Sequence, residues 1–499
     1  MNKKYLSFII LILIATGIIF FLRVKKVNNY AIVPEEGVAD VTSEEELEVS
    51  ESKILFLDTE KEATHFSKVA GNPEAYWMRG MSVIWNDVER EKGEFDWSHL
   101  DEILSEGNEY FEGGVYNLAM IWPYANWDQK TCHNGKKYEA TGHLKGGDED
   151  LMLGTPCDFG AYAKFLEKVV ERYDGDGIDD APGLRTPVKY WEIMNEPAMQ
   201  GGSIGGAGED LKFFVGTSEE YFNILKTSYE VIKKSDSDAK VAHGGMAGMH
   251  KKFVDFWTPI FEMGGGEYFD IANIHAVSVD ENAEDLYVIK FKKFLDKYDL
   301  GDKPIWVTEA QFGDLMRSPG NLNSFDEMLV RSSVFSLAHG ADKIFLIENW
   351  IHWDQAFEMD IKKNKKNDGD LMEKFDDKNM EDKKDKMEKF KEFNLGTENN
   401  STHKAYINLV KKLNSFDKIE IIKDESIDNL NDHQGSTSVI GQYKFIDGDQ
   451  VAYVLWGNYA VPEEIKGDVV MTDIYGNFRN MKADEIVATK DVIFVELLE

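Results

Sequence analysis

Short apolar runs alternate with helix-period segments along most of this chain, and this alternation constrains the fold more than any other feature of the sequence. Seven of the runs are clear strand candidates, and an earlier run at 54–57 is an eighth. The seven are 77–84, 114–122, 188–195, 239–244, 269–275, 304–309 and 341–348. Segments with the apolar spacing of one helix face, such as 159–173, lie between them. Because parallel strands need helical crossovers, this pattern predicts a parallel sheet.

Eight strand–helix units over about 350 residues fit a closed (β/α)8, or TIM, barrel. A doubly wound open sheet is the alternative, although no GxGxxG or GxxxxGK(S/T) motif follows any strand candidate. The predicted barrel domain spans residues 53–415 and includes a charge-rich insertion near 356–395. Beyond it, short strand-like runs with turn signals between them predict an antiparallel β domain over 416–499. The chain is therefore expected to be an α/β protein with a small second domain.

The N-terminal segment 1–27 contains an uncharged apolar run, 5–22, with basic residues on both sides. This run is short for a membrane span and long for the apolar part of a signal peptide. We expect an uncleaved membrane anchor, since no convincing A-x-A cleavage site follows, and a cleaved signal peptide is the alternative. Residues 28–52 are mainly acidic and predict a solvated linker. The rest of the protein would then lie outside the cytoplasm, either anchored or secreted.

Charge limits the partners of this protein. The 499 residues include 56 basic and 91 acidic side chains, which give a formal net charge of −35. Nucleic acids need a basic surface, so they are excluded as partners. Contact with a membrane is expected only through the N-terminal segment, and no feature of the sequence indicates an oligomeric state.

The chain contains two cysteines, Cys132 and Cys157, and both lie in one long polar stretch after the third strand candidate. In an exported protein they are expected to form a disulfide. The chain-entropy model assigns such a loop closure roughly 3 kcal/mol of stability. Two unpaired thiols are the alternative.

Several polar and aromatic side chains stand at the ends of the predicted strands, which is where active sites form in (β/α)8 barrels. Asn195 and Glu196 follow the fourth strand, and Glu309 ends the seventh. Pro197 lacks an N–H group for the ladder, so we expect it to stop the fourth strand and leave Glu196 facing the site. The other residues predicted to contact substrate are Arg79, Trp85, Trp122, His275 and Trp350.

Two glutamates at one end of a barrel suit glycoside hydrolysis. One carboxyl group must be protonated to protonate the leaving oxygen, and the other must be ionised to attack or stabilise the sugar. A charge on one group raises the pKa of the other, so proximity separates the two roles. Aromatic side chains at the rim supply apolar faces for sugar rings. The sequence thus predicts a carbohydrate-processing site around Glu196 and Glu309.

These motifs resemble the clan A glycoside hydrolases, the retaining (β/α)8 enzymes that include families 5 and 39. The resemblance rests on YWEIMNEP, WVTEAQFG, the histidine of FDIANIHAV, the ENW after the eighth strand, and WNDVEREKGEFDWS after the second. It implies that Glu196 is the acid/base and Glu309 the nucleophile, with their carboxyl groups about 5–5.5 Å apart. It also implies that Asn195 binds the 2-hydroxyl of the sugar and that Arg79 supports the nucleophile. Trp350 would form a sugar platform.

The acidic stretch YDGDGIDD places Asp174, Asp176 and Asp180 at a spacing similar to that of short calcium loops. It is a candidate structural calcium site, and a solvated acidic turn is the alternative. The stretch lies between a helix and the fourth strand, and therefore at the opposite end of the barrel from the predicted active site. The predicted activity requires no cofactor.

From these features we expect an exported retaining glycoside hydrolase that cleaves β-linked poly- or oligosaccharides by a two-glutamate double displacement. A non-catalytic glycan-binding protein on a degenerate barrel is the alternative from another class. The tyrosine that family 5 enzymes often carry two residues after the sixth-strand histidine is replaced here by Val277, which favours that alternative. A transglycosylase would use the same two glutamates as the hydrolase.

Overall fold

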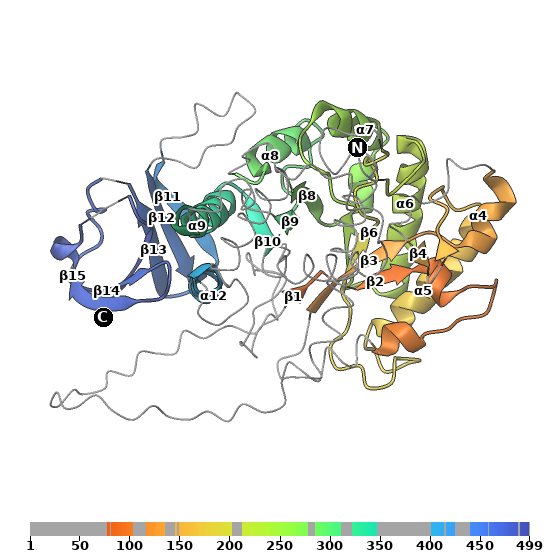
Figure 1. The fold of residues 1–499 in the computed structure, drawn as a ribbon, viewed down its shortest axis with the longest axis horizontal. Helices are drawn as coiled ribbons and strands as arrows, with labels where there is room; N and C mark the ends of the chain where they lie inside the picture. The colour runs from red at the N-terminus through yellow and green to blue at the C-terminus, as the bar shows by residue number, and fades with distance from the viewer. Residues whose placement is uncertain are drawn as a thin grey trace, which may run out of the picture.

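The computed structural model of the chain contains a parallel barrel and an antiparallel β domain (Figure 1). It describes residues 77–79, 81–102, 116–134, 145–146, 149–201, 212–277, 285–310, 322–346, 401–413, 416–424, 440–457, 459–487 and 490–498. Four predicted parts of the chain fall outside these ranges: the segments 1–27 and 28–52, the strand at 54–57, and the insertion near 356–395. Every helix within the described ranges is too short or too polar to span a bilayer.

The barrel strands are parallel and follow the predicted order along the chain. They are β1 (Trp77–Met78), β2 (Ser82–Ile84), β3 (Tyr116–Trp122), β6 (Tyr190–Ile193), β7 (Lys240–His243), β8 (Ala272–Ala276), β9 (Ile305–Ala310) and β10 (Ala341–Leu346). One sheet contains β1, β2, β3, β6 and β7, and a second contains β8, β9 and β10. Two isolated parallel bridges, Ala242–Ile271 and Met246–Ile274, join the sheets. The strand predicted at 77–84 is interrupted around Arg79, and both of its halves pair with β3.

Aromatic contacts across the interior show that the strands enclose a barrel. Trp77 of β1 contacts Trp306 of β9 and Phe345 of β10, with ring centroids 5.6 and 6.3 Å apart. Tyr190 of β6 lies 5.3 Å from Trp306 by the same measure. In an open doubly wound sheet, side chains from the first and last strands would not meet. The closed arrangement is therefore the correct one of the two that the sequence allowed.

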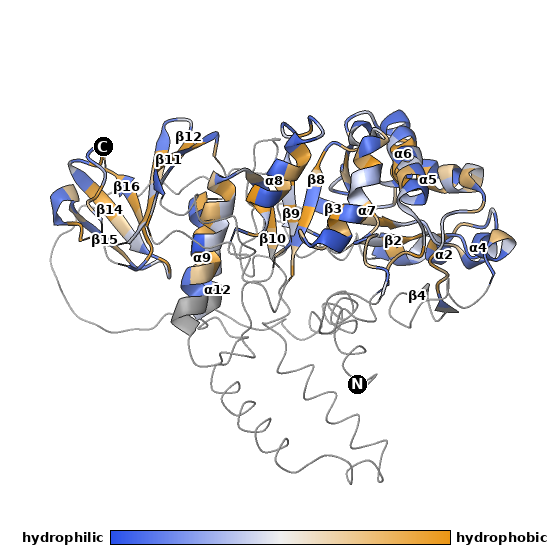
Figure 2. Ribbon diagram, turned by 90° about the horizontal axis from the view of Figure 1, so that it is seen from above, coloured by the Kyte–Doolittle hydropathy of each residue, from blue (hydrophilic) through white to orange (hydrophobic). Residues whose placement is uncertain are grey.

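Helices cover the outside of the barrel, as parallel strands require. They are α5 (Phe159–Tyr173), α6 (Ser218–Ser235), α7 (Lys251–Glu262), α8 (Val288–Asp296) and α9 (Leu322–Ala338), with the 3₁₀ turn η4 (Gly265–Tyr268). The short helices α2 (Trp85–Val88) and α4 (Asn126–Cys132) lie in the loops that follow β2 and β3. Figure 2 shows that helices such as α5 and α6 carry both hydrophobic and hydrophilic residues. The buried residues of α5, which include Tyr162, Phe165 and Val169, lie on the face that the periodicity predicted.

The C-terminal domain is one antiparallel sheet with the strand order β11-β12-β13-β16-β14-β15. Its elements are β11 (Lys418–Asp424), β12 (Gly441–Asp447), β13 (Gln450–Trp456), β14 (Asp468–Asp473), β15 (Phe478–Lys482), η8 (Ala483–Glu485) and β16 (Ile493–Leu497). One face shares a hydrophobic core with α9 and α12 (Ser401–Leu413), which lie between this sheet and the barrel (Figure 1). The other face has a small core of its own around Tyr453, Val469 and Val495. The small β domain expected from the sequence is therefore present.

Candidate active site

The segment Asn195-Glu196-Pro197 forms a strained turn directly after β6. The strand ends at Ile193 because Met194 adopts a left-handed backbone conformation, with φ of 70°. Glu196 is also left-handed, with φ of 41°. Such a conformation costs a non-glycine residue about 1–3 kcal/mol. The prediction that Pro197 stops the strand is therefore wrong, since Met194 has already ended it.

Tyr221 of α6 and Gly244 hold this turn in place. The Tyr221 hydroxyl donates to the carbonyl oxygen of Ile193 at 3.0 Å and accepts from the Gly244 N–H at 2.8 Å. A Cβ atom added to Gly244 would lie 2.7 Å from the same carbonyl oxygen, so only glycine allows this approach. These contacts fix the backbone that would otherwise relax.

A β-bulge at the end of β9 brings two consecutive side chains into the barrel. Ile274 of β8 pairs with Val307, but the next residue, His275, pairs with Glu309. Thr308 is thus the extra residue on its strand. In a regular strand Thr308 and Glu309 would face opposite sides of the sheet. Here Thr308 bonds to His275 and Glu309 bonds to Arg79, so both take part in the same polar network.

Glu196 and Glu309 converge on His275. One oxygen of each glutamate and one ring nitrogen of His275 lie within 4.8 Å of one another. His275 Nδ1 is 2.8 Å from Glu196 Oε1 and 3.6 Å from Glu309 Oε2. Each glutamate keeps an exposed fraction of 7%. The distance of at most 4.8 Å between these oxygens of Glu196 and Glu309 is close to the roughly 5–5.5 Å between the carboxyl groups of retaining glycosidases. It is well below the roughly 6.5–9.5 Å found in inverting enzymes.

Arg79 connects Glu309 to a third carboxylate that is fully buried. Its Nη1 donates to Glu309 Oε1 at 2.6 Å, and its Nη2 donates to Asn195 Oδ1 at 2.7 Å. Glu192 accepts from Nε at 2.5 Å and from Nη2 at 2.9 Å. Because Glu192 has no exposed surface, it cannot reach a substrate. Its two bonds hold the guanidinium so that Nη1 faces Glu309.

The surroundings shift the pKa values of the two accessible glutamates in opposite directions. Burial raises the pKa of Glu196, and the charge of Glu309 adds to that rise, although His275 opposes it. Burial also acts to raise the pKa of Glu309, but His275 and Arg79 outweigh it and lower this pKa below its ordinary value. Opposite shifts in a pair of carboxyl groups assign the acid and the anion. Glu196 is therefore suited to hold a proton, and Glu309 to stay ionised.

The tryptophans predicted to contact substrate have different outcomes. Trp85 is fully buried, stacks on Phe165 of α5, and donates its indole N–H to Glu89 Oε2 at 2.6 Å. The prediction that it contacts substrate is therefore wrong, because it anchors α5 to the barrel instead. Trp122 ends β3 with an exposed fraction of 4%, and its indole N–H has no acceptor within the described part of the chain. Trp350 lies outside the described residues.

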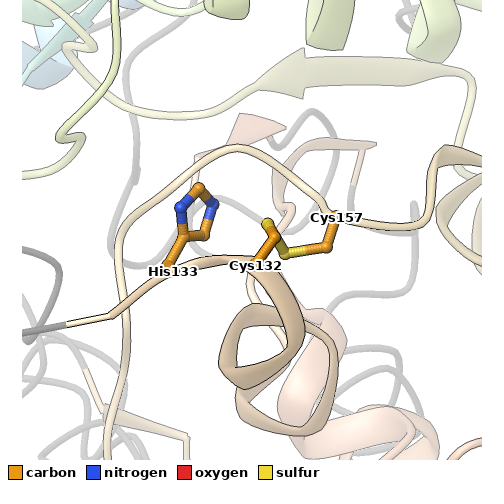
Figure 3. A group of neighbouring side chains, drawn as sticks. All are labelled: Cys132, His133 and Cys157. Carbon is orange, nitrogen blue, oxygen red and sulfur yellow. A yellow bond between two sulfur atoms is a disulfide. The ribbon is translucent and has the colours of Figure 1, made fainter.

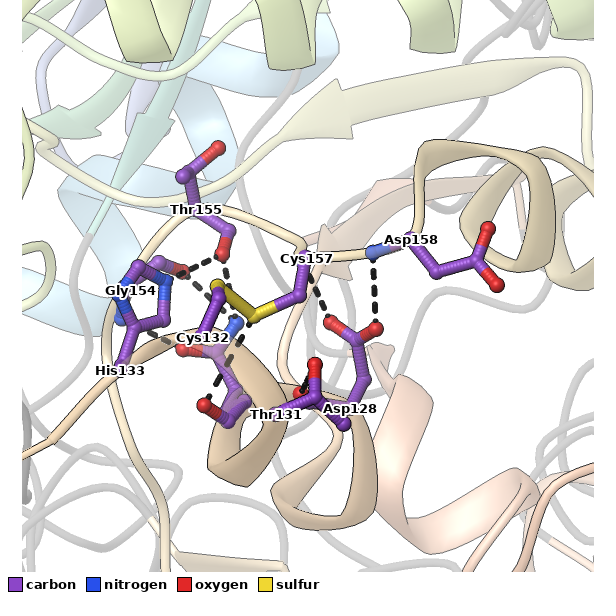
Figure 4. The surroundings of a disulfide bond; sticks show 9 residues. Asp128, Thr131, Cys132, His133, Gly154, Thr155, Cys157 and Asp158 are labelled. Carbon is purple, nitrogen blue, oxygen red and sulfur yellow. Dashed lines mark hydrogen bonds between the residues drawn. A yellow bond between two sulfur atoms is a disulfide. The ribbon is translucent and has the colours of Figure 1, made fainter.

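A disulfide between Cys132 and Cys157 closes the loop after β3, in the pairing expected from the sequence (Figure 3). The loop includes a short hairpin of β4 (Lys145–Gly146) and β5 (Glu149–Asp150). Beside the disulfide, Asp128 accepts from the N–H groups of Cys157 and Asp158, and the His133 ring bonds to the Thr155 carbonyl oxygen at 2.7 Å (Figure 4). As a loop between a barrel strand and the next helix, it lies at the same end of the barrel as the glutamates.

The three aspartates of the candidate calcium loop also lie together. One oxygen each of Asp174, Asp176 and Asp180 lies within 4.8 Å of the others. The backbone N–H groups of Gly175 and Gly177 already donate to Asp180. These bonds suffice to explain an acidic turn, and calcium at this loop stays a prediction.

Comparison with known proteins supports the fold. No protein-family model matches the sequence, and no curated protein matches it. A glucosidase from Croceicoccus marinus is similar in structure, with a TM-score of 0.50 and 11% identity over 87% of this chain and 96% of that chain. A family 39 glycoside hydrolase from Bacteroides cellulosilyticus WH2 has a TM-score of 0.48 and 15% identity, over 85% of this chain and 76% of that chain. A monomeric beta-xylosidase from Caulobacter crescentus CB15 has a TM-score of 0.44 and 10% identity, over 85% of this chain and 89% of that chain.

The first of these likenesses shows that the chain has a barrel fold that glycoside hydrolases use. Fold alone does not determine activity. The activity therefore has to be argued from Glu196, Glu309 and the residues that bond to them.

Proposed function

We propose that this protein is a retaining glycoside hydrolase that acts on β-linked poly- or oligosaccharides. The observation that carries the proposal is the approach of Glu196 and Glu309 to within 4.8 Å, with pKa values shifted in opposite directions. The structural likeness to a glucosidase supports it. The preference for β-linkages rests on the sequence resemblance to clan A.

In the first step, a carboxylate oxygen of Glu309 attacks the anomeric carbon of the sugar. The bond between that carbon and the glycosidic oxygen breaks, and the leaving oxygen takes the proton of Glu196. Arg79 keeps Glu309 ionised before the attack. Because Asn195 Oδ1 is occupied by Arg79, the amide N–H groups of Asn195 are those that would bind the 2-hydroxyl.

In the second step, Glu196 removes a proton from water, and the water oxygen attacks the same carbon. The ester bond to Glu309 breaks, and both carboxyl groups return to their starting protonation states. The two displacements together retain the configuration of the anomeric carbon. The mechanism uses only side chains and water, so it requires no cofactor.

Azide rescue tests the two roles separately. Glu196→Ala and Glu309→Ala should each lower the turnover of an aryl β-glycoside by about 10²–10⁴-fold, the usual contribution of such a group. Azide should then restore turnover in both variants. In Glu196→Ala it attacks the glycosyl-enzyme and gives the β-azide, whereas in Glu309→Ala it replaces the nucleophile and gives the α-azide. Glu89→Gln, a change to a buried glutamate outside the pair, is the matched control.

Different results would favour the alternatives. A protein that binds glycans but whose glutamate variants do not differ from wild type in turnover would be a binding protein. The same azide anomer from both variants would refute the assignment of roles. Transfer to an excess of acceptor sugar in preference to water would identify a transglycosylase.

We also infer that the protein is exported. The apolar segment at 5–22 with its basic flanks supports this, as does the disulfide, because disulfides persist in oxidising compartments. Fractionation of cells that express the full chain, followed by N-terminal sequencing, tests it. An intact Met1 in the membrane fraction indicates an anchor, a shortened N-terminus indicates a signal peptide, and a cytosolic chain refutes export.

A further inference from the structure

A continuous chain of hydrogen bonds joins the two accessible glutamates through the interior of the barrel. Its members in order are Glu196, His275, Thr308, Asn273, Glu192, Arg79 and Glu309. The consecutive distances are 2.8, 2.9, 2.7, 2.9, 2.5 and 2.6 Å. Because each side chain has a fixed set of donors and acceptors, the direction of the bonds in the middle of the chain can be worked out.

The amide of Asn273 has one possible orientation. Its Nδ2 lies 2.9 Å from Glu192 Oε1 and 3.2 Å from the His243 carbonyl oxygen, and both of these atoms only accept. Its Oδ1 therefore faces Thr308 Oγ1, at 2.7 Å. An amide oxygen has no proton, so the single hydroxyl proton of Thr308 must point to it.

His243 fixes the backbone of Asn273 in the same way. Its Nδ1 lies 2.8 Å from the Gly244 carbonyl oxygen and so carries a proton, while its Nε2 accepts from the Asn273 N–H at 3.0 Å. Burial lowers the pKa of His243 to about 3, so this ring stays neutral. The position of Asn273, and with it the direction of the Thr308 hydroxyl, is thus held by a histidine that does not titrate near neutral pH.

Thr308 in turn fixes one nitrogen of His275. Since its hydroxyl proton points to Asn273, Thr308 Oγ1 can only accept from His275 Nε2, at 2.9 Å. His275 Nε2 therefore carries a proton. Any second proton on the ring must be on Nδ1, which lies 2.8 Å from Glu196 Oε1.

We propose that Thr308 and Asn273 are positioning residues that hold His275 as an imidazolium, which donates through Nε2 to Thr308 and through Nδ1 to Glu196 Oε1. The proton of the general acid then resides on Glu196 Oε2, because Oε1 is already an acceptor. A neutral His275 with its proton on Nε2 would instead draw the acid proton onto Oε1, toward the ring. This inference rests on the proposed function, since it specifies which oxygen of Glu196 donates.

The charges around the ring favour this state. Glu309 Oε2 lies 3.6 Å from Nδ1, and Glu192 Oε1 lies 3.9 Å from Nε2. Arg79 opposes a positive ring, but the carboxylates outweigh it, and the pKa of His275 is raised in spite of its burial. With Glu196 protonated and His275 positive, the formal charges of these two carboxylates, Arg79 and the ring cancel. Of the pair formed by Glu196 and His275, only Glu196 then changes its charge during turnover, and His275 stays positive.

The ring has no freedom to turn away from these partners. On the β7 side, a Cβ atom added to Gly245 would lie 2.0 Å from His275 Nε2. The backbone just after β7 therefore packs directly against the imidazole, and the titratable side chain of β7 that interacts with His275, His243, stays neutral. Among the described residues, the charged and polar groups that face the ring and bear on its protonation are Glu196, Glu309, Glu192, Arg79 and Thr308.

Two measurements test the proposal. Thr308→Val removes the acceptor at nearly constant volume and should move the basic limb of the kcat/KM profile to lower pH by about one unit or more, since bonds to charged groups have this strength. Thr308→Ser should restore the wild-type limb. Thr472→Val, at a buried threonine of the β domain, should leave the profile unchanged. A uniform loss of rate without a shift would indicate a merely structural role and refute the proposal.

The second measurement is independent of activity. In ¹⁵N-histidine-labelled protein, both nitrogens of His275 should be protonated at the pH of maximum activity, with the signals assigned by their loss in His275→Gln. In Thr308→Val one nitrogen should be unprotonated at the same pH. An unprotonated nitrogen in the wild type would overturn the proposal. If no hydrolysis is found, the proposed function fails, and the wild-type spectrum still supports or refutes the imidazolium.

Discussion

Replacing Arg79 with lysine should raise the pKa of Glu309 while a positive charge stays in the barrel. Arg79 donates four hydrogen bonds from three nitrogens, and these reach Glu192, Asn195 and Glu309. A lysine ammonium is a single centre that cannot span three such partners. Because Glu192 is fully buried and needs a cation more than Glu309 does, the ammonium should remain with Glu192. The contact that is lost is therefore the one to Glu309.

The lost bond sets the size of the effect. It measures 2.6 Å between Arg79 Nη1 and Glu309 Oε1, and charge-assisted bonds of this kind contribute about 1.5–3 kcal/mol. One pKa unit corresponds to about 1.4 kcal/mol, so the pKa of Glu309 should rise by about one to two units. Glu309 attacks as the anion, so activity is lost as the pH falls through this pKa. The acidic limb of kcat/KM should move to higher pH by the same amount.

The assay is the pH profile of kcat/KM for an aryl β-glycoside, measured for wild type and Arg79→Lys. Arg172→Lys is the matched control, because Arg172 also binds a carboxylate, that of Asp101, at a site away from the glutamate pair. Its profile should coincide with that of the wild type. If Arg79→Lys lowers kcat/KM equally at every pH, Arg79 does not control the ionisation of Glu309, and the reasoning above is wrong.

Three further perturbations have defined outcomes. Cys132→Ser combined with Cys157→Ser should lower the free energy of unfolding by about 3.5 kcal/mol in urea melts, from the chain-entropy relation for a sequence separation of 25, and equal melts would contradict this. Gly245→Ala should displace the His275 ring and reduce kcat/KM at least tenfold, whereas wild-type rates would show that the ring tolerates the methyl group. His243 has its pKa lowered from 6.5 to about 3, so the unfolded chain binds a proton that the folded chain does not. Stability should thus fall as the pH drops from about 6.5 toward 3, by up to about 5 kcal/mol, and a flat series of urea melts would refute it.

The order of the strands and the pairing of the glutamates could be predicted because both depend on local patterns. Apolar periodicity marked the strands, and the (β/α)8 rule places their C-terminal ends together. The details of those ends could not be predicted in this way. The left-handed turn at Met194 depends on Tyr221 and on the close approach of Gly244, and the bulge at Thr308 depends on the pairing of β8 with β9. These are contacts between distant parts of the chain, and they leave no periodic signal.

Trp85 and Trp122 show that the end of a strand does not by itself decide where an aromatic side chain points. Both follow or end a predicted strand, and both were expected to face a sugar. Trp85 begins a helix immediately after β2, which turns its ring back toward α5. Trp122 is the last residue of β3 and lies two positions after Met120 and four after Leu118. Leu118 belongs to the interior core together with Trp77, and residues two or four positions apart on a strand face the same side. Strand alternation assigns Trp122 to the barrel interior at the C-terminal end of its strand, so its contact with substrate stays a prediction, whereas Trp85 is turned away from the site.

The buried polar residues did have a signal in the sequence. Glu192 and Asn273 interrupt otherwise apolar strands, at positions whose alternation places them inside the barrel. An interior carboxylate is too costly to persist without a cationic partner, so Glu192 by itself implies a buried arginine or lysine. Arg79, which lies between β1 and β2, meets that requirement through two hydrogen bonds. The third carboxylate and its cation could therefore have been predicted together.

The different roles proposed for the two accessible glutamates come from their partners and not from their depth. Both have the same exposed fraction of 7%, so burial alone would raise both pKa values alike. The nearby ring of His275 lowers the pKa of Glu309, and the hydrogen-bonded guanidinium of Arg79, which does not lose its proton, lowers it further. Glu196 bonds to His275, but this bond does not outweigh burial and the neighbouring charge of Glu309, so the pKa of Glu196 stays raised. The group that must stay ionised is thus paired with a permanent cation, and the group that must gain and lose a proton is paired with a histidine.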